Sequence, residues 1–379
     1  MGYISDMELE EVIIAEIRRR GPLNFEDFMN MALYHPRLGY YSGKLVPVGK
    51  SGDFYTAPHV HAIFGALIGR QLEEMWLALG RPRRFTAVEI GAGRGFLARD
   101  LLDFLKPSVL YQHLEYLIVE RNPFNRVSQQ KLLREHAGKA TWAAALPELE
   151  PFCGCLLSNE LLDAFPVRLV ETGDDAGDGL CEIFVDTGDG GFQEVRRPAG
   201  PEVKKYLAEF APSLDPGYRT EVNLRVRDWL ADVHGKLERG FILTVDYGFS
   251  AAEFYQLGRN RGTLLCYHGH EAGEDPFVHV GRQDITAHIN FSALKSWGET
   301  FGMRTLGYAS QGPYLVALGI DRLIHRYAGN PPDPMELTKI KQLFMPQGLG
   351  ESHKVMVQYK GDGKPELKGF SLRNEMDRL

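Results

Sequence analysis

The sequence predicts an α/β protein whose core is a parallel β-sheet with helices on both faces. Apolar strand-like runs alternate with amphipathic helical segments from residue 85 onward, and such alternation is typical of a parallel sheet covered by helices. The first of these strands runs directly into three closely spaced glycines, a pattern typical of a ligand-binding turn between a strand and a helix. A helical segment precedes this core, and a glycine-rich hairpin pattern interrupts it.

The chain is expected to contain more than one structural part, because 379 residues exceed what a single core usually supports. Residues 1–80 are predicted to form a helical N-terminal extension with substrate-facing loops. Residues 81–379 are predicted to form the main domain, with insertions at about 167–238 and 249–290. The helices expected within the extension are 6–20, 24–33 and 59–79.

The main domain is predicted to carry four strands of the parallel sheet, at 85–90, 113–120, 153–158 and 241–246. Helices are expected at 96–106 and 123–136, between the first three strands. The first insertion shows three short strands separated by glycine turns, at 167–171, 180–186 and 192–195, followed by helices at 201–210 and 223–237. Further on we expect a helix at 291–301, two helices around 331–334 and a last strand at 353–359.

Composition excludes several function classes. The net charge of −7 without a basic block argues against non-specific nucleic-acid binding, and no apolar run approaches the roughly 20 residues of a membrane span. The N-terminus is acidic first and basic last, unlike a targeting peptide, so a cytoplasmic location is expected. The four cysteines suggest no disulfide framework, and the histidine pairs match no metal motif, so we expect no metal.

The turn after the first strand is the first candidate binding site. Gly91, Gly93 and Gly95 stand at alternate positions, which lets the backbone approach a ligand closely. The dinucleotide fingerprint places its third glycine one residue later than this chain does. Glu89 would repel a diphosphate but suits a cofactor with a cationic part, such as S-adenosylmethionine. We therefore predict contacts to this cofactor from Glu89, Gly91, Ala92, Gly93 and Gly95.

The second strand ends in Glu120, another predicted cofactor residue. A carboxylate at this place can accept hydrogen bonds from both hydroxyls of a ribose. Nicotinamide enzymes and S-adenosylmethionine enzymes share this feature, so Glu120 indicates a nucleoside without choosing between them.

Three polar residues, Asn159, Glu160 and Asp163, follow the next strand within a few positions. A helix cap would explain one of them, and three together favour a functional site. We predict that all three are catalytic and that the Asn159 amide also holds the substrate or the amino-acid end of the cofactor. A second tier of residues is predicted to bind substrate, although structural roles as caps or buried hydrogen-bond partners stay open. These residues are Asp53, Tyr55, Thr56, Tyr247, Asp284 and His288, the last also a possible proton acceptor.

Motifs in a fixed order along nearly the whole chain resemble those of the MidA-type class I methyltransferases, a family that includes a mitochondrial complex I assembly methyltransferase. The matching segments are Tyr34-His35-Pro36 and Gly39-Tyr40-Tyr41; Gly52-Asp53-Phe54 with Thr56 and Pro58; Glu89-Ile90-Gly91-Ala92-Gly93 with Gly95; Asn159-Glu160 with Asp163-Ala164-Phe165-Pro166; Asp246-Tyr247-Gly248; Gly262-Thr263-Leu264; Asp284-Ile285-Thr286-Ala287-His288; and Met345-Pro346.

The resemblance implies a Rossmann-like, seven-stranded class I methyltransferase sheet and S-adenosylmethionine as cofactor. It further implies a protein arginine methyltransferase whose substrate is the quinone-site core subunit of respiratory complex I or its bacterial counterpart. A mitochondrial matrix location would replace the cytoplasm in a eukaryote. Carboxylates that fork onto a guanidinium can hold it in plane and draw positive charge from the reacting nitrogen, and Glu160 and Asp163 are the candidates for this role.

Two other functions stay open at this point. One is a non-catalytic assembly factor that retains the cofactor site. The other is a nicotinamide-dependent oxidoreductase, which the glycine spacing and Glu89 disfavour.

Overall fold

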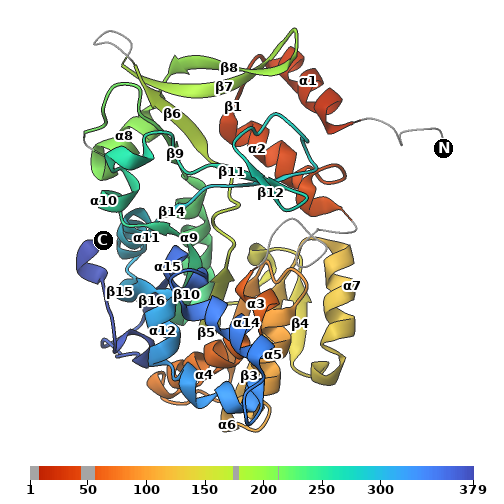
Figure 1. Cartoon of the computed structure of the whole chain (residues 1–379), viewed down its shortest axis with the longest axis vertical. Coiled ribbons are helices and arrows are strands. Elements are labelled where there is room, and N and C mark those ends of the chain that lie inside the picture. The colour runs from red at the N-terminus through yellow and green to blue at the C-terminus, as the bar shows by residue number, and fades with distance from the viewer. Residues whose placement is uncertain (1–7, 44–55, 174–178, 212) are drawn as a thin grey trace, which may run out of the picture. The chain divides into compact units, whose positions relative to one another are not determined.

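A computed structural model describes residues 8–43, 56–173, 179–211 and 213–379. The chain divides into two compact units, each assembled from three segments (Figure 1). Unit 1 comprises Met1–Phe54, Asp163–Val226 and Phe249–Asn290, and unit 2 comprises Tyr55–Leu162, Arg227–Gly248 and Phe291–Leu379. The sequence suggested a boundary near residue 80, whereas residues 55–80 group with unit 2 in this division.

Unit 2 is built on seven strands of an eight-stranded sheet, in the order β4-β3-β2-β5-β10-β16-β15; the eighth strand, β14 (Ile289–Asn290), pairs with β10 off this path. Strands β4, β3, β2, β5 and β10 are parallel to one another, and β16 is antiparallel to both β10 and β15. The mostly parallel path of seven strands that the resemblance implied is therefore present, with β14 added to it. The strands are β2 (Phe85–Ile90), β3 (Leu114–Val119), β4 (Ala140–Ala143), β5 (Phe152–Asn159), β10 (Leu237–Phe249), β15 (Arg304–Ser310) and β16 (His353–Lys360).

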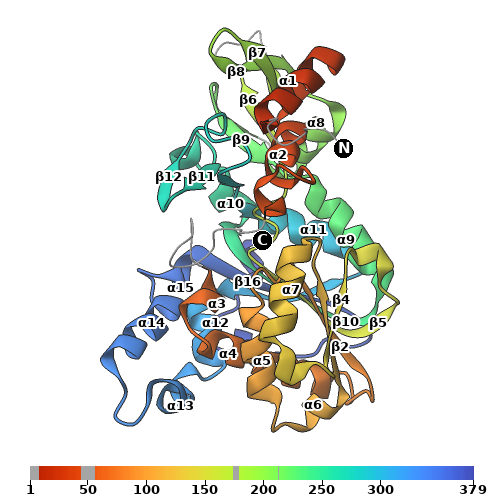
Figure 2. The same cartoon turned by 90° about the vertical axis from the view of Figure 1, so that its right-hand side faces the viewer.

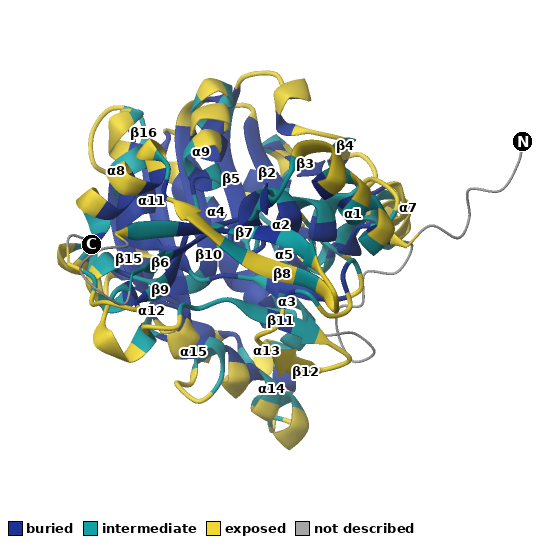
Figure 3. Ribbon diagram, turned by 90° about the horizontal axis from the view of Figure 1, so that it is seen from above, coloured by how far each residue is buried: buried dark blue, intermediate teal, exposed yellow. Residues whose placement is uncertain are grey.

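The central strands β2, β5 and β10 are buried over most of their length because both faces of the sheet are covered, as Figure 3 shows. Two glycines let these strands approach one another closely. A Cβ atom on Gly154 of β5 would lie 2.0 Å from the Thr86 carbonyl oxygen of β2, and one on Gly240 of β10 would lie 1.9 Å from the Gly154 carbonyl oxygen. Side chains at these two positions are therefore excluded by the neighbouring backbone.

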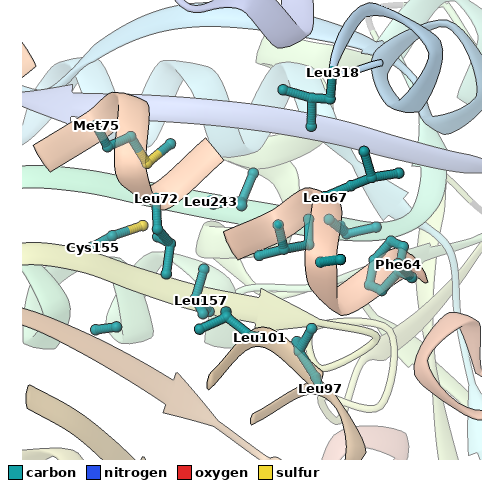
Figure 4. Packing of buried hydrophobic residues seen from close by; sticks show 14 of the residues in the cluster. Phe64, Leu67, Leu72, Met75, Leu97, Leu101, Cys155, Leu157, Leu243 and Leu318 are labelled. Atoms are coloured by element: carbon teal, nitrogen blue, oxygen red, sulfur yellow. The ribbon is translucent and has the colours of Figure 1, made fainter. Parts of the chain in front are cut away.

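Helices cover both faces of this sheet. On one face, α4 (Ile63–Ala78) and α5 (Phe96–Leu105) share an apolar core with Cys155, Leu157 and Leu243 of the strands (Figure 4). On the other face, α11 (Phe291–Thr300) accepts a hydrogen bond from Gln358 of β16, and α9 (Arg225–Lys236) accepts one from Lys360. Val355, Val357 and Tyr359 of β16 belong instead to the core shared with α4 and α5, so the alternation of side chains along β16 separates two helix layers.

Two predicted helices differ from the structure. The segment 59–79 forms two helices, α3 (Ala57–Val60) and α4, because His61 adopts an extended backbone between them. Its Nδ1 atom accepts the Ile63 N–H at 3.0 Å, and its Nε2 atom lies 3.1 Å from a Glu336 carboxylate oxygen. Helix α7 (Pro123–Leu132), labelled in Figure 2, ends one turn earlier than the predicted helix 123–136. The chain continues as a 3₁₀ helix at Arg134–His136.

Unit 1 combines two helices with antiparallel sheets. Helices α1 (Leu9–Arg20) and α2 (Phe25–Tyr34) share a core with residues of β6 and β7, and the predicted hairpin insertion forms most of a five-stranded sheet. That sheet contains β1 (Leu23–Asn24), β6 (Arg168–Thr172), β7 (Leu180–Gly188), β8 (Gly191–Pro198) and β9 (Arg219–Val222). A smaller sheet contains β11 (Leu265–His268), β12 (Glu271–Gly273) and β13 (Asp284–Thr286), and helix α8 spans Pro201–Phe210.

Across the part of the chain that the structure describes, no helix has both the length and the apolar character needed to cross a membrane.

Candidate active site

The carboxyl ends of four neighbouring parallel strands of unit 2, β3, β2, β5 and β10, carry most of the predicted site residues. Loops at this edge of an open α/β sheet are where such folds bind their ligands. The loops are also joined locally. The Gly91 N–H donates to the Val119 carbonyl at 3.1 Å, and a Cβ atom on Gly91 would lie 3.0 Å from the Leu161 side chain of the β5 loop.

The glycine loop after β2 has the backbone that only glycine adopts readily. Gly91, Gly93 and Gly95 have φ angles of 70°, 53° and 83°, in the left-handed region. Gly95 immediately precedes helix α5, so the first N–H groups of that helix face the loop without partners in the helix itself. A Cβ atom on Gly93 would have no heavy atom within 4 Å. The loop therefore offers open space and backbone donors to a ligand.

Glu89 lies at the base of this loop with only 3 % of its surface exposed. The Tyr116 hydroxyl donates to its carboxylate at 2.7 Å. Burial raises the pKa of Glu89 to about 7, and nearby Glu120 raises it as well, although the Tyr116 hydrogen bond acts in the opposite direction. A carboxylate in this environment is stabilised in its ionised form by a cationic ligand group.

Glu120 is buried at the end of β3 and is held by three donors. One oxygen accepts the Asn122 N–H at 2.8 Å, and the other accepts the amides of Gln129 at 3.0 Å and Asn125 at 3.3 Å. Burial raises the pKa of Glu120, and these donors oppose that shift. A carboxylate offers about four lone-pair positions, so one position stays open for a ribose hydroxyl. To accept hydrogen bonds from both ribose hydroxyls, Glu120 would have to give up its 3.3 Å hydrogen bond from the Asn125 amide.

Glu160 follows β5 in a left-handed backbone, with φ at 46°, which is uncommon for a residue other than glycine. Its N–H donates to the Val245 carbonyl at 2.8 Å. Its Oε1 atom accepts the Ala57 N–H and the Asn159 amide, each at 3.2 Å, and lies 3.6 Å from the His353 Nε2 atom. The Oε2 atom has no hydrogen-bond partner among the described residues. One carboxylate oxygen is thus anchored and the other is available.

Asp246 fixes the loop that carries Glu160. Its fully buried carboxylate accepts the N–H groups of Leu161 at 3.2 Å, Leu162 at 2.9 Å and Tyr247 at 2.9 Å. Burial raises the pKa of Asp246 to about 7, and the Glu160 carboxylate raises it further against the effect of these N–H donors. Asp246 is therefore a positioning residue for Glu160.

Two histidines that the sequence analysis did not select lie around Glu160. The His59 Nδ1 atom lies 2.6 Å from the Thr56 hydroxyl oxygen, and burial lowers the pKa of His59 to about 4 although Glu160 opposes the shift. The His353 ring lies against the Tyr247 ring, with the centroids 3.9 Å apart. His59 directly follows the matching segment that contains Thr56 and Pro58, so the sequence could have indicated it as a site residue. His353 is the first residue of strand β16 and lies in no matching segment, so the sequence did not indicate it.

The other predicted residues that the structure describes belong to unit 1. The Tyr41 hydroxyl donates to the Asp284 carboxylate at 2.7 Å. Burial raises the pKa of Tyr41 well above its ordinary value, and Asp284 and Asp163 contribute, so unit 1 brings these two carboxylates into one neighbourhood. The His288 N–H donates to the Thr263 hydroxyl at 3.0 Å. Asp53 and Tyr55 lie outside the described residues.

Residues 67–309 match the model of a family described as S-adenosyl-L-methionine-dependent methyltransferases, Methyltransf_28. This match covers more than half of the chain. The chain belongs to this methyltransferase family. Membership of this family sets aside a function as a nicotinamide oxidoreductase. The class I methyltransferase fold, predicted from the resemblance, is confirmed by the mostly parallel sheet and by the similar solved structure described next.

Several known proteins are similar to this methyltransferase. A COG1565 superfamily protein from Burkholderia thailandensis, solved with S-adenosyl-homocysteine bound, is 33 % identical, has a TM-score of 0.88 and is matched over 98 % of this chain and 96 % of its own. The mitochondrial protein arginine methyltransferase NDUFAF7 homolog of Drosophila melanogaster is 27 % identical over 93 % of this chain and 85 % of its own length. The human protein arginine methyltransferase NDUFAF7 is 25 % identical over 89 % and 80 %.

S-adenosylmethionine is the cofactor of this methyltransferase, and the residues present fit it. The open space at Gly93 leaves room for the cofactor to approach the glycine loop. The spare lone pair of Glu120 can accept a hydrogen bond from a ribose hydroxyl. The buried carboxyl of Glu89 would be stabilised in its ionised form by the ammonium group of the cofactor. The buried Asn159 Oδ1 atom has no partner among the described residues and can accept a further hydrogen bond. When bound, the cofactor supplies a methyl group activated by a sulfonium.

Proposed function

We propose that this methyltransferase transfers a methyl group to a guanidinium nitrogen of an arginine in a protein. The observation that carries the proposal is the arrangement of Glu160. Its backbone is held in a left-handed conformation, its Oε1 atom is anchored by two donors, and its Oε2 atom is left for another group. Unusual backbone conformations of this kind concentrate at functional sites.

A guanidinium is matched by acceptors because it carries five N–H donors and no acceptor. Glu160 Oε2 and Asn159 Oδ1 are two acceptors on adjacent residues, each without a hydrogen-bond partner among the described residues. Arginine is charged at any ordinary pH and its nitrogen lone pairs are delocalised. A carboxylate that holds the group in plane and concentrates its positive charge away from the reacting nitrogen would favour transfer.

The arginine specificity stated in the names of the Drosophila and human relatives supports this proposal. Asp163 stays a second candidate for a guanidinium partner, as the sequence motif predicted. We further propose a subunit of respiratory complex I as the methyl acceptor, since the motifs resemble those of a complex I assembly methyltransferase. On this proposal the enzyme acts in the cytoplasm of a bacterium or in the mitochondrial matrix of a eukaryote.

The proposal is tested by incubating the purified protein with methyl-labelled S-adenosylmethionine and an extract of cells that lack its gene. We expect one predominant labelled protein, and acid hydrolysis of that protein should release labelled methylarginine. Label on another residue type would contradict arginine as the acceptor. Binding of the cofactor without label in any fraction would instead favour a non-catalytic assembly factor.

A further inference from the structure

Helix α7 carries a buried amide, Gln129, that joins the two predicted cofactor-binding elements of unit 2. Its Nε2 atom donates to the Gly93 carbonyl of the glycine loop at 2.8 Å and to the Glu120 carboxylate at 3.0 Å. Its Oε1 atom accepts the Trp142 indole N–H from β4 at 2.9 Å. Gln129 is fully buried; its hydrogen bond to Glu120 is buried, and those to Gly93 and Trp142 are partly buried.

The orientation of this amide is fixed by its partners. An indole nitrogen only donates, so the oxygen of Gln129 must face Trp142. A carbonyl and a carboxylate only accept, so both Nε2 hydrogens are used, one on Gly93 and one on Glu120. Rotation of the amide by half a turn would place its NH₂ group against the Trp142 N–H, and its oxygen against the Gly93 carbonyl and the Glu120 carboxylate. All of these hydrogen bonds would be lost, and each buried group left unpaired would destabilise the site.

The aliphatic part of Gln129 also touches the glycine loop. A Cβ atom on Gly95 would lie 3.2 Å from the Gln129 Cγ atom. The side chain therefore packs against one glycine of the loop and bonds to another, while its amide reaches the carboxylate at the end of the neighbouring strand.

We propose that Gln129 is a positioning residue for S-adenosylmethionine. Its side chain sets the distance between the glycine loop and the Glu120 carboxylate, so that both contact the same nucleoside. This inference rests on the assignment of the glycine loop and Glu120 to the cofactor and does not depend on the identity of the methyl acceptor. Trp142 orients the Gln129 amide and so acts on the cofactor site only through Gln129.

The test compares binding of S-adenosyl-homocysteine by the wild type and by Gln129→Glu, using calorimetry between about pH 6 and about pH 8. When ionised, the introduced carboxylate has no hydrogen to donate and places a second charge beside Glu120, so affinity should fall by about 10- to 100-fold at the higher pH. At the lower pH the introduced carboxyl group, once protonated, can donate one hydrogen bond, so the ratio of wild-type to variant affinity should narrow. A residue that merely fills space would give a ratio that does not vary with pH.

Gln130→Glu is the matched control, because Gln130 is the next residue of α7 and is exposed; it should bind as the wild type does. Gln129→Met keeps the side-chain volume but removes the hydrogen-bond donor. Its affinity for S-adenosyl-homocysteine should therefore be lower than that of the wild type by a factor that does not change with pH.

Unchanged affinity in both Gln129 variants would overturn the proposal. Failure of the wild type itself to bind would overturn the cofactor site and not only the role of Gln129. If Gln129→Glu does not fold, Gln129→Met decides the matter by the same comparison.

Discussion

Glu89 and Glu160 are both carboxylates removed from water, yet their neighbours differ. Glu89 has one hydroxyl donor, from Tyr116, and its pKa rises to about 7 through burial. Glu160 has two donors on one oxygen and an open second oxygen. The first arrangement suits a ligand that brings a positive charge, and the second suits a ligand that brings N–H donors.

The raised pKa of Glu89 predicts a pH dependence of cofactor binding. Above about pH 7 the carboxyl is ionised and attracts the cofactor ammonium, so the affinity for S-adenosyl-homocysteine should rise as pH increases through about 7. Glu89→Gln should weaken binding by about tenfold at the higher pH, as expected for loss of one partly buried ion pair. The same substitution should also remove the rise of affinity with pH. Calorimetric titration across this range checks both statements, and a step that persists in Glu89→Gln would show that another group is responsible.

The sequence reveals the acidic site residues more readily than their supports. Glu89 lies near the end of a recognisable apolar strand, Glu120 and Glu160 directly follow such strands, and the end of a parallel strand is a known place for ligands. Gln129 and Asp246 act through partners 36 and 85 residues away along the chain. A single sequence carries no record of such hydrogen bonds. Gln129 therefore emerges only from the structure, and Asp246, which belongs to a matching motif, acquires its positioning role only there.

At the scale of elements, the spacing of β2, β5 and β10 depends on two glycines, because a Cβ atom on either Gly154 or Gly240 would collide with the neighbouring backbone. Glu89 lies near the end of β2 and Glu160 directly follows β5, so this spacing also sets the width of the site. The central strands were predictable from their apolar runs. The outer strands β4 and β15 were not, since they are short or mixed in character and their pairing depends on neighbours distant in the chain.

Gly154→Ala should therefore lower the free energy of unfolding by at least about 3 kcal/mol, the scale of severe overpacking, or prevent folding. Denaturation by urea measures the change. Gly235→Ala is the control, because Gly235 is exposed in helix α9 and a Cβ atom there would have no heavy atom within 4 Å; it should raise stability by about 0.5 to 1 kcal/mol. A Gly154→Ala protein as stable as the wild type would contradict the close approach of β2 and β5.

At the scale of the whole molecule, three separate segments form each unit. In unit 1, helices α1 and α2 bury their apolar faces with Leu169 of β6, Val185 of β7 and Ile285 of β13. The sequence revealed these helices and the hairpin strands one by one. Their assembly into one unit depends on contacts between residues more than 100 positions apart, for which local periodicity gives no signal.

Buried carboxyl groups also affect the stability of the whole chain. In the absence of cofactor, the pKa of Glu89 is about 7 in the folded state against 4.5 ordinarily, so the folded state retains a proton that the unfolded state has lost. Relative to Glu89→Gln, the wild type should lose stability as pH rises from about 4.5 to about 7, by up to about 1.4 kcal/mol per pH unit. Thermal and urea denaturation of the two proteins across this range measures the difference, and a difference independent of pH would contradict the buried, titrating carboxyl.

The central claim, that the open oxygen of Glu160 holds the substrate guanidinium, is tested most directly by Glu160→Gln. The anchored position keeps its oxygen against the Ala57 N–H and the Asn159 amide, so the new NH₂ group occupies the place of Oε2 and presents donors to a group that has only donors. We predict that methyl transfer to the acceptor protein falls by about 100-fold or more while the affinity for S-adenosyl-homocysteine changes by less than about threefold. Glu150→Gln, at an exposed position before β5, should leave both quantities unchanged. Methyl transfer by Glu160→Gln within a few-fold of the wild type would contradict the claim.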